Sequence, residues 1–318
     1  MVERGSLRVV FFGTPAFAVP TLEALLESPH QVVAVVTQPD RPRGRGQKTT
    51  ASPVKTRALA AGVPVLQPET VKDPAFSAAL SGLDSEIGIV AAYGQILTQA
   101  LLDTPRLGML NVHASLLPRY RGAAPVHRSV INGDVETGIT IMRMVKALDA
   151  GPMLATALRS IDIDETSEEL ESDLAVMGAR LLRTTLDDVA AAAPPEIPQD
   201  DSAATYAPRL TKDDGRIDWA WPAARIHNLI RGLHPWPHAV TFLAQQRFIL
   251  HRSQMSTHVA GRPPGTILEA AGDRLRVATG DGVLEVVEIQ AEGKRPMRVR
   301  EFLAGHPLPA GGVFHAPQ

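Results

Sequence analysis

The sequence predicts an α/β protein: a mainly parallel sheet covered by helices, followed by a smaller all-β domain. Three observations support this fold class. The chain has 318 residues, which is enough for about two domains at roughly 150 residues each. Short apolar runs alternate with helical stretches in the first half, as in proteins with a parallel sheet. After a proline-rich segment the pattern changes to short strands separated by turns.

Runs of consecutive apolar residues mark the strands of the first domain. Helices cover both faces of a parallel sheet, so its strands are apolar throughout rather than alternating. The predicted strands are Leu7–Phe12, Val32–Val36, Val63–Leu66, Ile87–Ala91 and Met109–Val112. The predicted helices between them are Ala16–Leu26 and residues 52–61, 73–81 and 97–103. This alternation implies right-handed crossovers.

Two further strands and a long helix complete the first domain. Gly138–Met144 and Met153–Ile161 are expected to be strands, joined by a hairpin around residues 145–152. Thr166–Ala192 is expected to be a helix, with acidic residues in its first turns as the helix dipole favours.

A change of composition separates the two halves. Ala193–Pro208 contains four prolines and few apolar residues, which is typical of a linker. A helix is then expected at Ala223–Leu233, followed by strands at residues 239–243, 247–252, 265–269, 274–278 and 283–289. These short strands predict a small barrel or sandwich. We therefore expect a catalytic domain at 1–192, a linker at 193–208 and a β domain at 209–318.

The composition excludes several kinds of protein. There are no cysteines, so disulfides, thiolate metal sites and a cysteine nucleophile are excluded. The first residues lack a signal-peptide pattern, and no apolar stretch reaches the roughly 18 residues of a membrane span. The sequence therefore predicts a soluble cytoplasmic protein with no membrane partner.

The formal net charge of −2 conceals a regional pattern. Residues 1–159 and 202–318 each carry a net charge of +4, whereas residues 160–201 carry −10. The overall charge argues against a strongly basic nucleic-acid binder, but the two basic regions do not.

The strongest basic run is Asp40–Arg57, which has six basic residues and one acid. It follows the second strand, at the sheet edge where open α/β proteins bind ligands. Two interpretations remain open on this evidence: a loop that binds a polyanion such as RNA, and a loop that is merely solvated.

Known nucleotide-binding motifs are absent. Gly13-Thr14-Pro15 follows the first strand, but it is not the GxGxxG pattern, and no acidic residue ends the second strand. A nicotinamide cofactor is therefore disfavoured.

Polar residues follow the fifth strand instead. Asn111 and His113 are two residues apart and should point to the same side. An amide donor and an imidazole placed together can stabilise an oxyanion and transfer a proton. Asp149, at the tip of the predicted hairpin, could orient the imidazole. Each of these residues could also be structural. With no metal-ligand set, the pattern favours acyl-type transfer through a tetrahedral intermediate.

The stretches Asn111–Gly122 (NVHASLLPRYRG) and Asp149–Gly151 resemble the 10-formyltetrahydrofolate-dependent formyltransferases. Further stretches, distributed in order over the whole chain, resemble the members that formylate the amino group of initiator methionyl-tRNA. These stretches are Phe12–Pro15 (FGTP), Thr37–Gly46 (TQPDRPRGRG), Ser52–Lys55 (SPVK), Ala92–Gly94 (AYG), Gly122–Pro125 (GAAP), Ile217–Trp219 (IDW), Pro235–Pro237 (PWP), Gly265–Leu268 (GTIL) and Ala278–Gly282 (ATGDG).

The resemblance implies a Rossmann-like formyltransferase domain and a C-terminal OB-like barrel that binds tRNA. It implies 10-formyltetrahydrofolate as co-substrate, no metal, and a monomer that binds folate and initiator methionyl-tRNA. The implied catalytic residues are Asn111, His113 and Asp149. The implied folate residues are Ser115, Leu116, Leu117 and Pro118, and the implied tRNA residues are Arg41, Arg43, Arg45 and Lys48.

One departure from the family pattern is visible: the usual GLDTG reads Ala147–Gly151 (ALDAG) here, with the Asp retained.

Two competing functions remain at this point. One is a formyltransferase that acts on a small amine, such as a nucleotide amino sugar or glycinamide ribotide. Residues 1–200 resemble such enzymes comparably at the active site, and Arg143–Lys146 (RMVK) resembles the sugar-acting ones. Such enzymes lack the basic run combined with a PWP-containing barrel. A non-catalytic RNA-binding module is the second alternative, but aromatic residues make up only 4% of the chain, which is few for base stacking.

Overall fold

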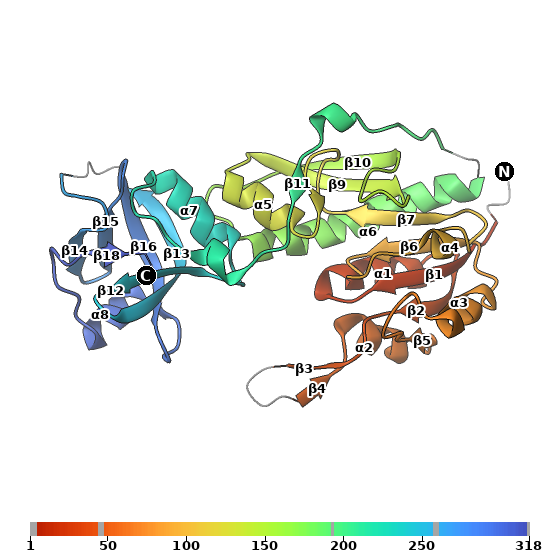
Figure 1. Cartoon of the computed structure of the whole chain (residues 1–318), viewed down its shortest axis with the longest axis horizontal. Coiled ribbons are helices and arrows are strands. Elements are labelled where there is room, and N and C mark those ends of the chain that lie inside the picture. Colours follow the sequence, from red (N-terminus) through yellow and green to blue (C-terminus); the bar gives the residue numbers. More distant parts are fainter. Residues whose placement is uncertain (1–4, 44–47, 192–193, 257–260, 317–318) are drawn as a thin grey trace. The chain divides into compact units, whose positions relative to one another are not determined.

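The computed structural model describes residues 5–43, 48–191, 194–256 and 261–316, and Figure 1 shows their helices and strands. The chain forms two compact units, each described below by itself. The first comprises Met1–Gly122, Thr137–Arg159 and Glu171–Tyr206, and the second comprises Ala123–Glu136, Ser160–Leu170 and Ala207–Gln318. No helix in the described part of the chain is long and apolar enough to cross a membrane.

The first unit is built on a seven-stranded sheet with the order β10-β9-β7-β6-β1-β2-β5. The pairs β1–β2, β1–β6, β2–β5 and β6–β7 are parallel, whereas β9 is antiparallel to β7. The strands are β1 (Arg8–Gly13), β2 (Gln31–Val36), β5 (Val65–Leu66), β6 (Ile87–Ala91), β7 (Met109–His113), β9 (Glu136–Arg143) and β10 (Met153–Ser160). The predicted strands and the mainly parallel sheet are confirmed.

Local capping sets where the helices of this unit begin. Ser52 and Asp73 each accept a backbone N–H with their side chains, and a proline follows each at the first helical position. Proline suits that position because its missing N–H would be unpaired there anyway. The helices are the 3₁₀ turn Ala16–Ala18, α1 (Val19–Leu26), α2 (Pro53–Ala60), α3 (Pro74–Ser81), α4 (Gln99–Leu102) and α6 (Ser167–Ala191).

The second unit contains an antiparallel sheet with the order β14-β15-β16-β13-β12-β18, and β17 pairs with β16. Its strands are β12 (Ala239–Leu243), β13 (Gln246–Ser256), β14 (Ile267–Ala271), β15 (Arg274–Ala278), β16 (Val283–Ala291), β17 (Met297–Arg298) and β18 (Phe314–His315). The five predicted strands are confirmed, and so is the predicted helix, as α7 (Ala223–Gly232). The two short strands β17 and β18 were not predicted.

Hydrogen bonds join the two ends of this sheet into an OB-like barrel. Phe314 N donates to Gly265 O, Ile267 N donates to Gly312 O, and Gly311 N donates to Ile267 O, each at 2.8 Å. The residues beside β14 and β18 thereby pair with each other, so the sheet curls into an OB-like half-barrel and these backbone groups are not left free at its two edges. Buried side chains fill the interior, and Trp219 stacks on Phe314 with ring centroids 5.7 Å apart.

Several short helical segments of the described chain fall outside the sequence prediction. α5 (Pro125–Asn132) and α8 (Val299–Gly305) are about two turns long, which is shorter than the window of roughly 11–18 residues over which a helical period is recognised. Lys212–Gly215 forms a 3₁₀ turn. His127 Nδ1 donates to Gly232 O, and Ser167 Oγ donates to the same oxygen. These bonds hold α5 and the start of α6 against α7 within the second unit.

The predicted linker is bonded to the first unit. Ile197 and Met153 exchange both backbone hydrogen bonds at 2.8 Å, and Thr205 O accepts from Arg121 N. The segment also contains the 3₁₀ turn Asp201–Ala203 and β11 (Tyr206–Ala207), which pairs with β8 (Arg121–Gly122). The low apolar content of this segment therefore does not mean that it is unattached. Backbone hydrogen bonds hold it in place. The boundaries 1–192, 193–208 and 209–318 stay predictions.

We predict that Gly265→Ala destabilises the barrel by at least about 2 kcal/mol. Gly265 has φ = +84°, and a Cβ there would lie 2.2 Å from Phe314 O. The substitution therefore combines left-handed strain with a clash at the closing hydrogen bonds. All three tryptophans lie at positions 219–236, so tryptophan fluorescence during urea unfolding reports on the second unit. Gly261→Ala is the control, because open space surrounds that position; equal midpoints for both variants would contradict the prediction.

Candidate active site

The carboxyl end of β7 carries the two polar residues that the sequence singles out. Asn111 is partly buried and His113 is buried, and both lie on this strand two residues apart, so they face the same side. Among the residues that the structure describes, no group bonds to the Asn111 side-chain amide. Its donors therefore remain available to a ligand.

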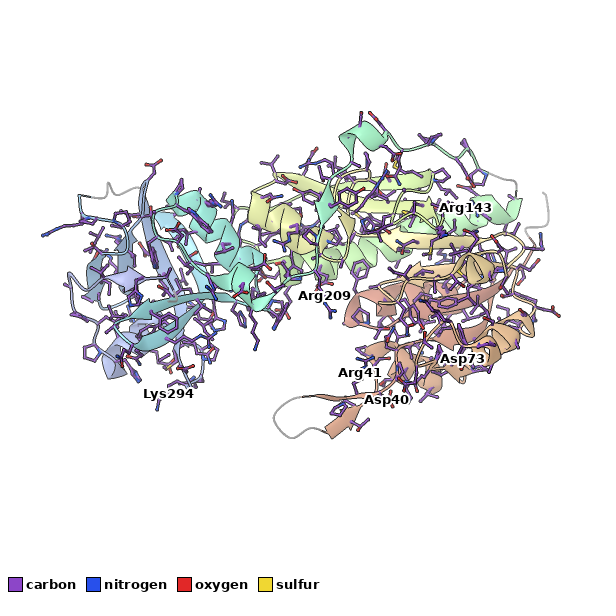
Figure 2. All side chains as sticks on the ribbon, viewed as in Figure 1. Asp40, Arg41, Asp73, Arg143, Arg209 and Lys294 are labelled. Atoms are coloured by element: carbon purple, nitrogen blue, oxygen red, sulfur yellow. The ribbon has the colours of Figure 1, made fainter. Side chains whose placement is uncertain are left out.

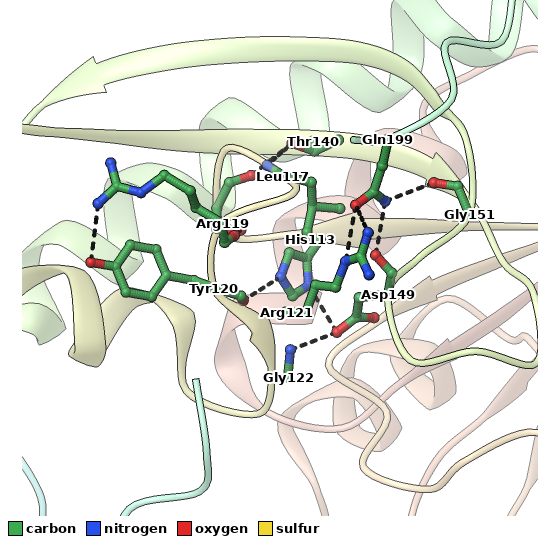
Figure 3. A network of polar contacts seen from close by, with 11 residues as sticks. His113, Leu117, Arg119, Tyr120, Arg121, Gly122, Thr140, Asp149, Gly151 and Gln199 are labelled. Atoms are coloured by element: carbon green, nitrogen blue, oxygen red, sulfur yellow. Dashed lines mark hydrogen bonds and ion pairs between the residues drawn. The ribbon is translucent and has the colours of Figure 1, made fainter. Parts of the chain in front are cut away.

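One hydrogen bond sets the tautomer of His113. Nε2 lies 3.0 Å from the backbone oxygen of Tyr120 (Figure 3). A carbonyl only accepts, so Nε2 carries the proton of this bond. The opposite nitrogen, Nδ1, lies 3.8 Å from Asp149 Oδ2. That distance is too long for a hydrogen bond but places a carboxylate beside Nδ1. Tyr120 is therefore the group that orients the ring directly, and the sequence did not indicate it.

Asp149 lies in the connection between β9 and β10, as expected. Its backbone has φ = +48°, a left-handed conformation that a non-glycine residue adopts only at some cost in free energy. Its Oδ2 accepts a hydrogen bond of 2.8 Å from Gly122 N. The carboxylate is thus fixed between the β9–β10 connection and the segment that follows β7.

Gln199 holds the other side of this connection. Its Nε2 donates to the backbone oxygens of Asp149 (2.8 Å) and Gly151 (2.7 Å), and its Oε1 accepts from the Arg121 guanidinium. Arg121 is buried and also pairs with Asp201 at 2.6 Å. The predicted linker therefore supplies a residue that positions the site. The only feature of the sequence that could have indicated this role is the side-chain amide of Gln199, which can donate and accept hydrogen bonds at the same time.

The turn after β7 is tied to β9. Thr140 Oγ1 donates to Ser115 O at 2.7 Å and accepts from Leu117 N at 3.1 Å. Ser115 is fully buried and its hydroxyl donates to Arg119 O, while Leu117 is also buried. These two residues shape the turn from inside. Leu116 and Pro118 are partly exposed, so they are the members of the predicted folate set whose side chains can reach a ligand.

Three of the predicted tRNA residues lie on a two-stranded ribbon of β3 (Arg41–Arg43) and β4 (Lys48–Thr50), in which Arg43 pairs with Lys48. Arg41 is exposed beside Asp40 where the ribbon begins (Figure 2). Arg45 lies outside the described residues, as do the side chains of Arg43 and Lys48.

An ion pair anchors this ribbon. Asp40 Oδ2 lies 2.5 Å from Lys55 Nζ, and its other oxygen accepts from Gln67. The hydrogen bond from Lys55 is the main reason that the pKa of Asp40 lies below its usual value. The single acid of the basic run thus neutralises a lysine on α2 and leaves the ribbon cationic.

The strand order reverses between β1 and β6, which is where open α/β sheets bind ligands. Thr14 Oγ1 donates to Tyr93 O at 3.0 Å across this point. The Tyr93 hydroxyl is buried and has no hydrogen-bond partner within the described part of the chain, and burial raises its pKa to about 12. This phenol therefore stays protonated and contributes a packing surface below the site.

Metal-ligand geometry does not occur in this region. Of the described residues, the only group spaced to hold a metal ion consists of His234, His238 and His251, all of the second unit.

Comparison with known sequences places this geometry in a family. The formyl transferase profile matches residues 7–186, more than half of the chain, and the profile of the formyl transferase C-terminal domain matches residues 209–307. The chain belongs to the formyl transferase family. The predicted family membership and fold class are confirmed, since both profiles occur in the expected order.

Relatives in this family span the whole chain. A protein of Caldanaerobacter subterraneus subsp. tengcongensis named methionyl-tRNA formyltransferase is 48% identical over 309 residues, covering 97% of this chain and 100% of the relative. A protein of Solibacter usitatus with the same name is 48% identical, with 95% and 96% covered.

Solved structures share the formyl transferase fold at lower identity. WlaRD, described as a sugar 3N-formyl transferase and crystallised with dTDP and 5-N-formyl-THF, has a TM-score of 0.67 at 17% identity and covers 92% of this chain and 100% of that one. An N-formyltransferase from Helicobacter canadensis, in complex with folinic acid and dTDP-3-aminofucose, has a TM-score of 0.68 at 17% identity, with 90% and 99% covered.

We predict that Gln199→Leu lowers the rate of formyl transfer about 10–100-fold, a loss of about 1.4–2.7 kcal/mol in transition-state stabilisation. Leucine preserves volume but removes the donor that holds the Asp149 connection. The measurement is kcat under saturating substrates. Asp200→Asn is the matched control, since within the described residues that neighbouring side chain bonds only to Ser202. A Gln199→Leu rate equal to that of the control would rule out the positioning role.

Proposed function

We propose that this chain transfers the formyl group of 10-formyltetrahydrofolate to the free amino group of methionyl initiator tRNA. The observation that carries the proposal is full-length similarity to relatives named methionyl-tRNA formyltransferase at 44–48% identity. The juxtaposition of Asn111, His113 and Asp149 provides a site suited to this chemistry. The sugar formyl transferases share the fold, but at 17% identity they say nothing about the substrate of this chain.

In the proposed reaction the uncharged α-amine of the aminoacyl ester attacks the formyl carbon carried on N10 of folate. A carbon–nitrogen bond forms, and negative charge develops on the formyl oxygen. The Asn111 amide, unbonded within the described structure, donates to that oxygen. Collapse of the tetrahedral intermediate breaks the bond to N10, which takes up a proton in place of the formyl group. The proton lost by the amine balances this step.

His113 is proposed to exchange protons through Nδ1. Its Nε2 proton is committed to Tyr120 O, so Nδ1 is the nitrogen left for substrate. Asp149 lies 3.8 Å from Nδ1, and its negative charge stabilises an imidazolium formed during transfer, as the acid of a catalytic triad does. Water or His113 then carries the amine proton to N10.

Folate is proposed to lie against the turn 115–118. Ser115 and Leu117 keep its shape from inside, while Leu116 and Pro118 offer an apolar surface. We propose that this co-substrate is the only small molecule the reaction needs.

For tRNA we propose two cationic surfaces, one on each unit. Arg41, Arg43 and Lys48 on the ribbon, together with Arg45, are proposed to contact the acceptor end. On the second unit, Arg209, Lys212, Lys294 and Arg298 are exposed, and none pairs with an acid in the described part of the chain. Displacement of counterions from phosphates would drive binding to both. We also propose that the chain acts as a monomer in the cytoplasm, where aminoacylated tRNA is used.

We predict that Asn111→Ala lowers kcat about 10²–10³-fold, a loss of about 2.7–4 kcal/mol, because one oxyanion donor disappears. The assay is single-turnover formylation of methionyl initiator tRNA, with folate affinity measured separately. Asn111→Asp should lose at least as much, because it replaces a donor by an acceptor of the same shape. Near-normal turnover of Asn111→Ala would refute the assignment.

We predict that Arg45→Ala raises KM for charged initiator tRNA about 10-fold and leaves KM for 10-formyltetrahydrofolate unchanged. Loss of one phosphate contact should also reduce the slope of log affinity against log salt by about 1. Lys72→Ala, an exposed cation of the same unit, is the control. Equal changes in both KM values, or no change in either, would contradict the contact.

Elongator methionyl-tRNA, free methionine and a nucleotide amino sugar should be formylated far more slowly. Preference for the amino sugar would instead support a small-amine formyltransferase. Absence of any formyl transfer, with tRNA binding intact, would support the RNA-binding module.

A further inference from the structure

Three histidines of the second unit converge although they are far apart in the sequence. His234 follows α7, His238 precedes β12, and His251 lies within β13. One nitrogen from each ring lies within 4.8 Å of the other two. The ring centroids of His238 and His251 are 4.5 Å apart, and those of His234 and His238 are 5.5 Å apart. None of these residues takes part in the proposed formyl transfer.

Polar atoms in this cluster are buried without partners. Nδ1 of His234 and Nδ1 of His238 are both inaccessible to water, and neither forms a hydrogen bond to any described residue. A buried polar atom left unpaired costs about 1–3 kcal/mol. Mutual packing of three rings explains their proximity but leaves this cost uncompensated, whereas a bound ion would remove it.

Hydrogen-bond acceptors outside the cluster fix the tautomer of two of the rings, His234 and His251. His251 Nε2 lies 2.8 Å from Gln290 Oε1, and the Gln290 amide nitrogen donates to Lys294 O, which fixes the oxygen toward the ring. His234 Nε2 lies 3.1 Å from Glu168 Oε2. Each acceptor requires a proton on Nε2, so the lone pair of each neutral ring is on Nδ1. Metal-binding histidines characteristically donate their other N–H to such an acceptor.

We propose that His234, His238 and His251 form a binding site for one divalent transition-metal ion, with Zn²⁺ as the expected occupant. Three neutral imidazoles are ligands of intermediate softness that suit Zn²⁺, Ni²⁺ and Cu²⁺ rather than Mg²⁺ or Ca²⁺. Water would complete a tetrahedral shell. The ion would tie the segment 234–238 to β13 and so stabilise the second unit. The site is independent of the formyl-transfer proposal.

The spacing fits such an ion after a small adjustment. Three atoms no more than 4.8 Å apart have a common point within about 2.8 Å of each, and Zn–N bonds are about 2.0–2.1 Å long. Each nitrogen therefore needs to move inward by less than about 1 Å.

The test uses the untagged full chain, stripped with EDTA and exchanged into metal-free buffer. Titration with ZnCl₂ by calorimetry should show one saturable site, and Co²⁺ should give the visible absorption of a nitrogen-ligated ion. Excess Zn²⁺ should raise the Tm of the tryptophan-reported transition by about 5–10 °C at 100-fold over Kd. Absence of a saturable site for either ion would overturn the proposal.

Variants identify the ligands. His251→Asn and His238→Asn should each weaken Zn²⁺ binding at least 100-fold, and asparagine tolerates the φ of +68° at position 238. Gln290→Leu leaves all three rings in place and should weaken binding about 10–100-fold. His315→Asn, outside the cluster, should bind like the parent. Unchanged affinity in both His238→Asn and Gln290→Leu would overturn the assignment even if His251→Asn fails to fold.

Discussion

Parallel pairing of β6 with β1 and β7 is the constraint on which the candidate site depends. It brings the carboxyl ends of these strands to one edge of the sheet, so Asn111, His113 and the Tyr93 segment meet there. Antiparallel pairing of β9 with β7 places Thr140 opposite His113 and Arg143 opposite Leu110. The connection that follows β9 therefore starts beside the amino end of β7 and has to run back along that strand to bring Asp149 within 3.8 Å of His113 Nδ1.

Much of this arrangement could be predicted from the sequence. The apolar runs located the principal strands, because strands buried on both faces have a distinctive composition. The spacing of Asn111 and His113 gave their common face. Short elements such as α5 and β18 escaped prediction, since they are shorter than the window over which a period can be recognised in a sequence. Tyr120 also escaped, because its contribution is a backbone oxygen, and any residue type supplies one.

The segment 193–208 shows a different limit of prediction. Its prolines and polar residues predict a chain that packs little, and its apolar burial is indeed small. What holds it is backbone pairing with Met153 and Arg121, together with the Gln199 amide. The acidic region behaves similarly. Several of its carboxylates form ion pairs with basic residues of the same chain. These pairs include Glu169 with Arg252, Asp173 with Arg159 and Glu196 with Arg143. Regional net charge therefore overstates the negative field that a ligand meets.

Closure of the barrel has a consequence for the behaviour of the chain outside the native state. The seam uses residues 265–267, beside β14, and residues 311–314, beside β18, which is the last strand in the sequence. Until this last strand arrives, the backbone groups beside β14 and on the outer side of β12 have no partners, and a second molecule can satisfy them. Residues 311–316 thus complete the pairing at both edges, and cleavage before them would leave two open edges suited to intermolecular pairing.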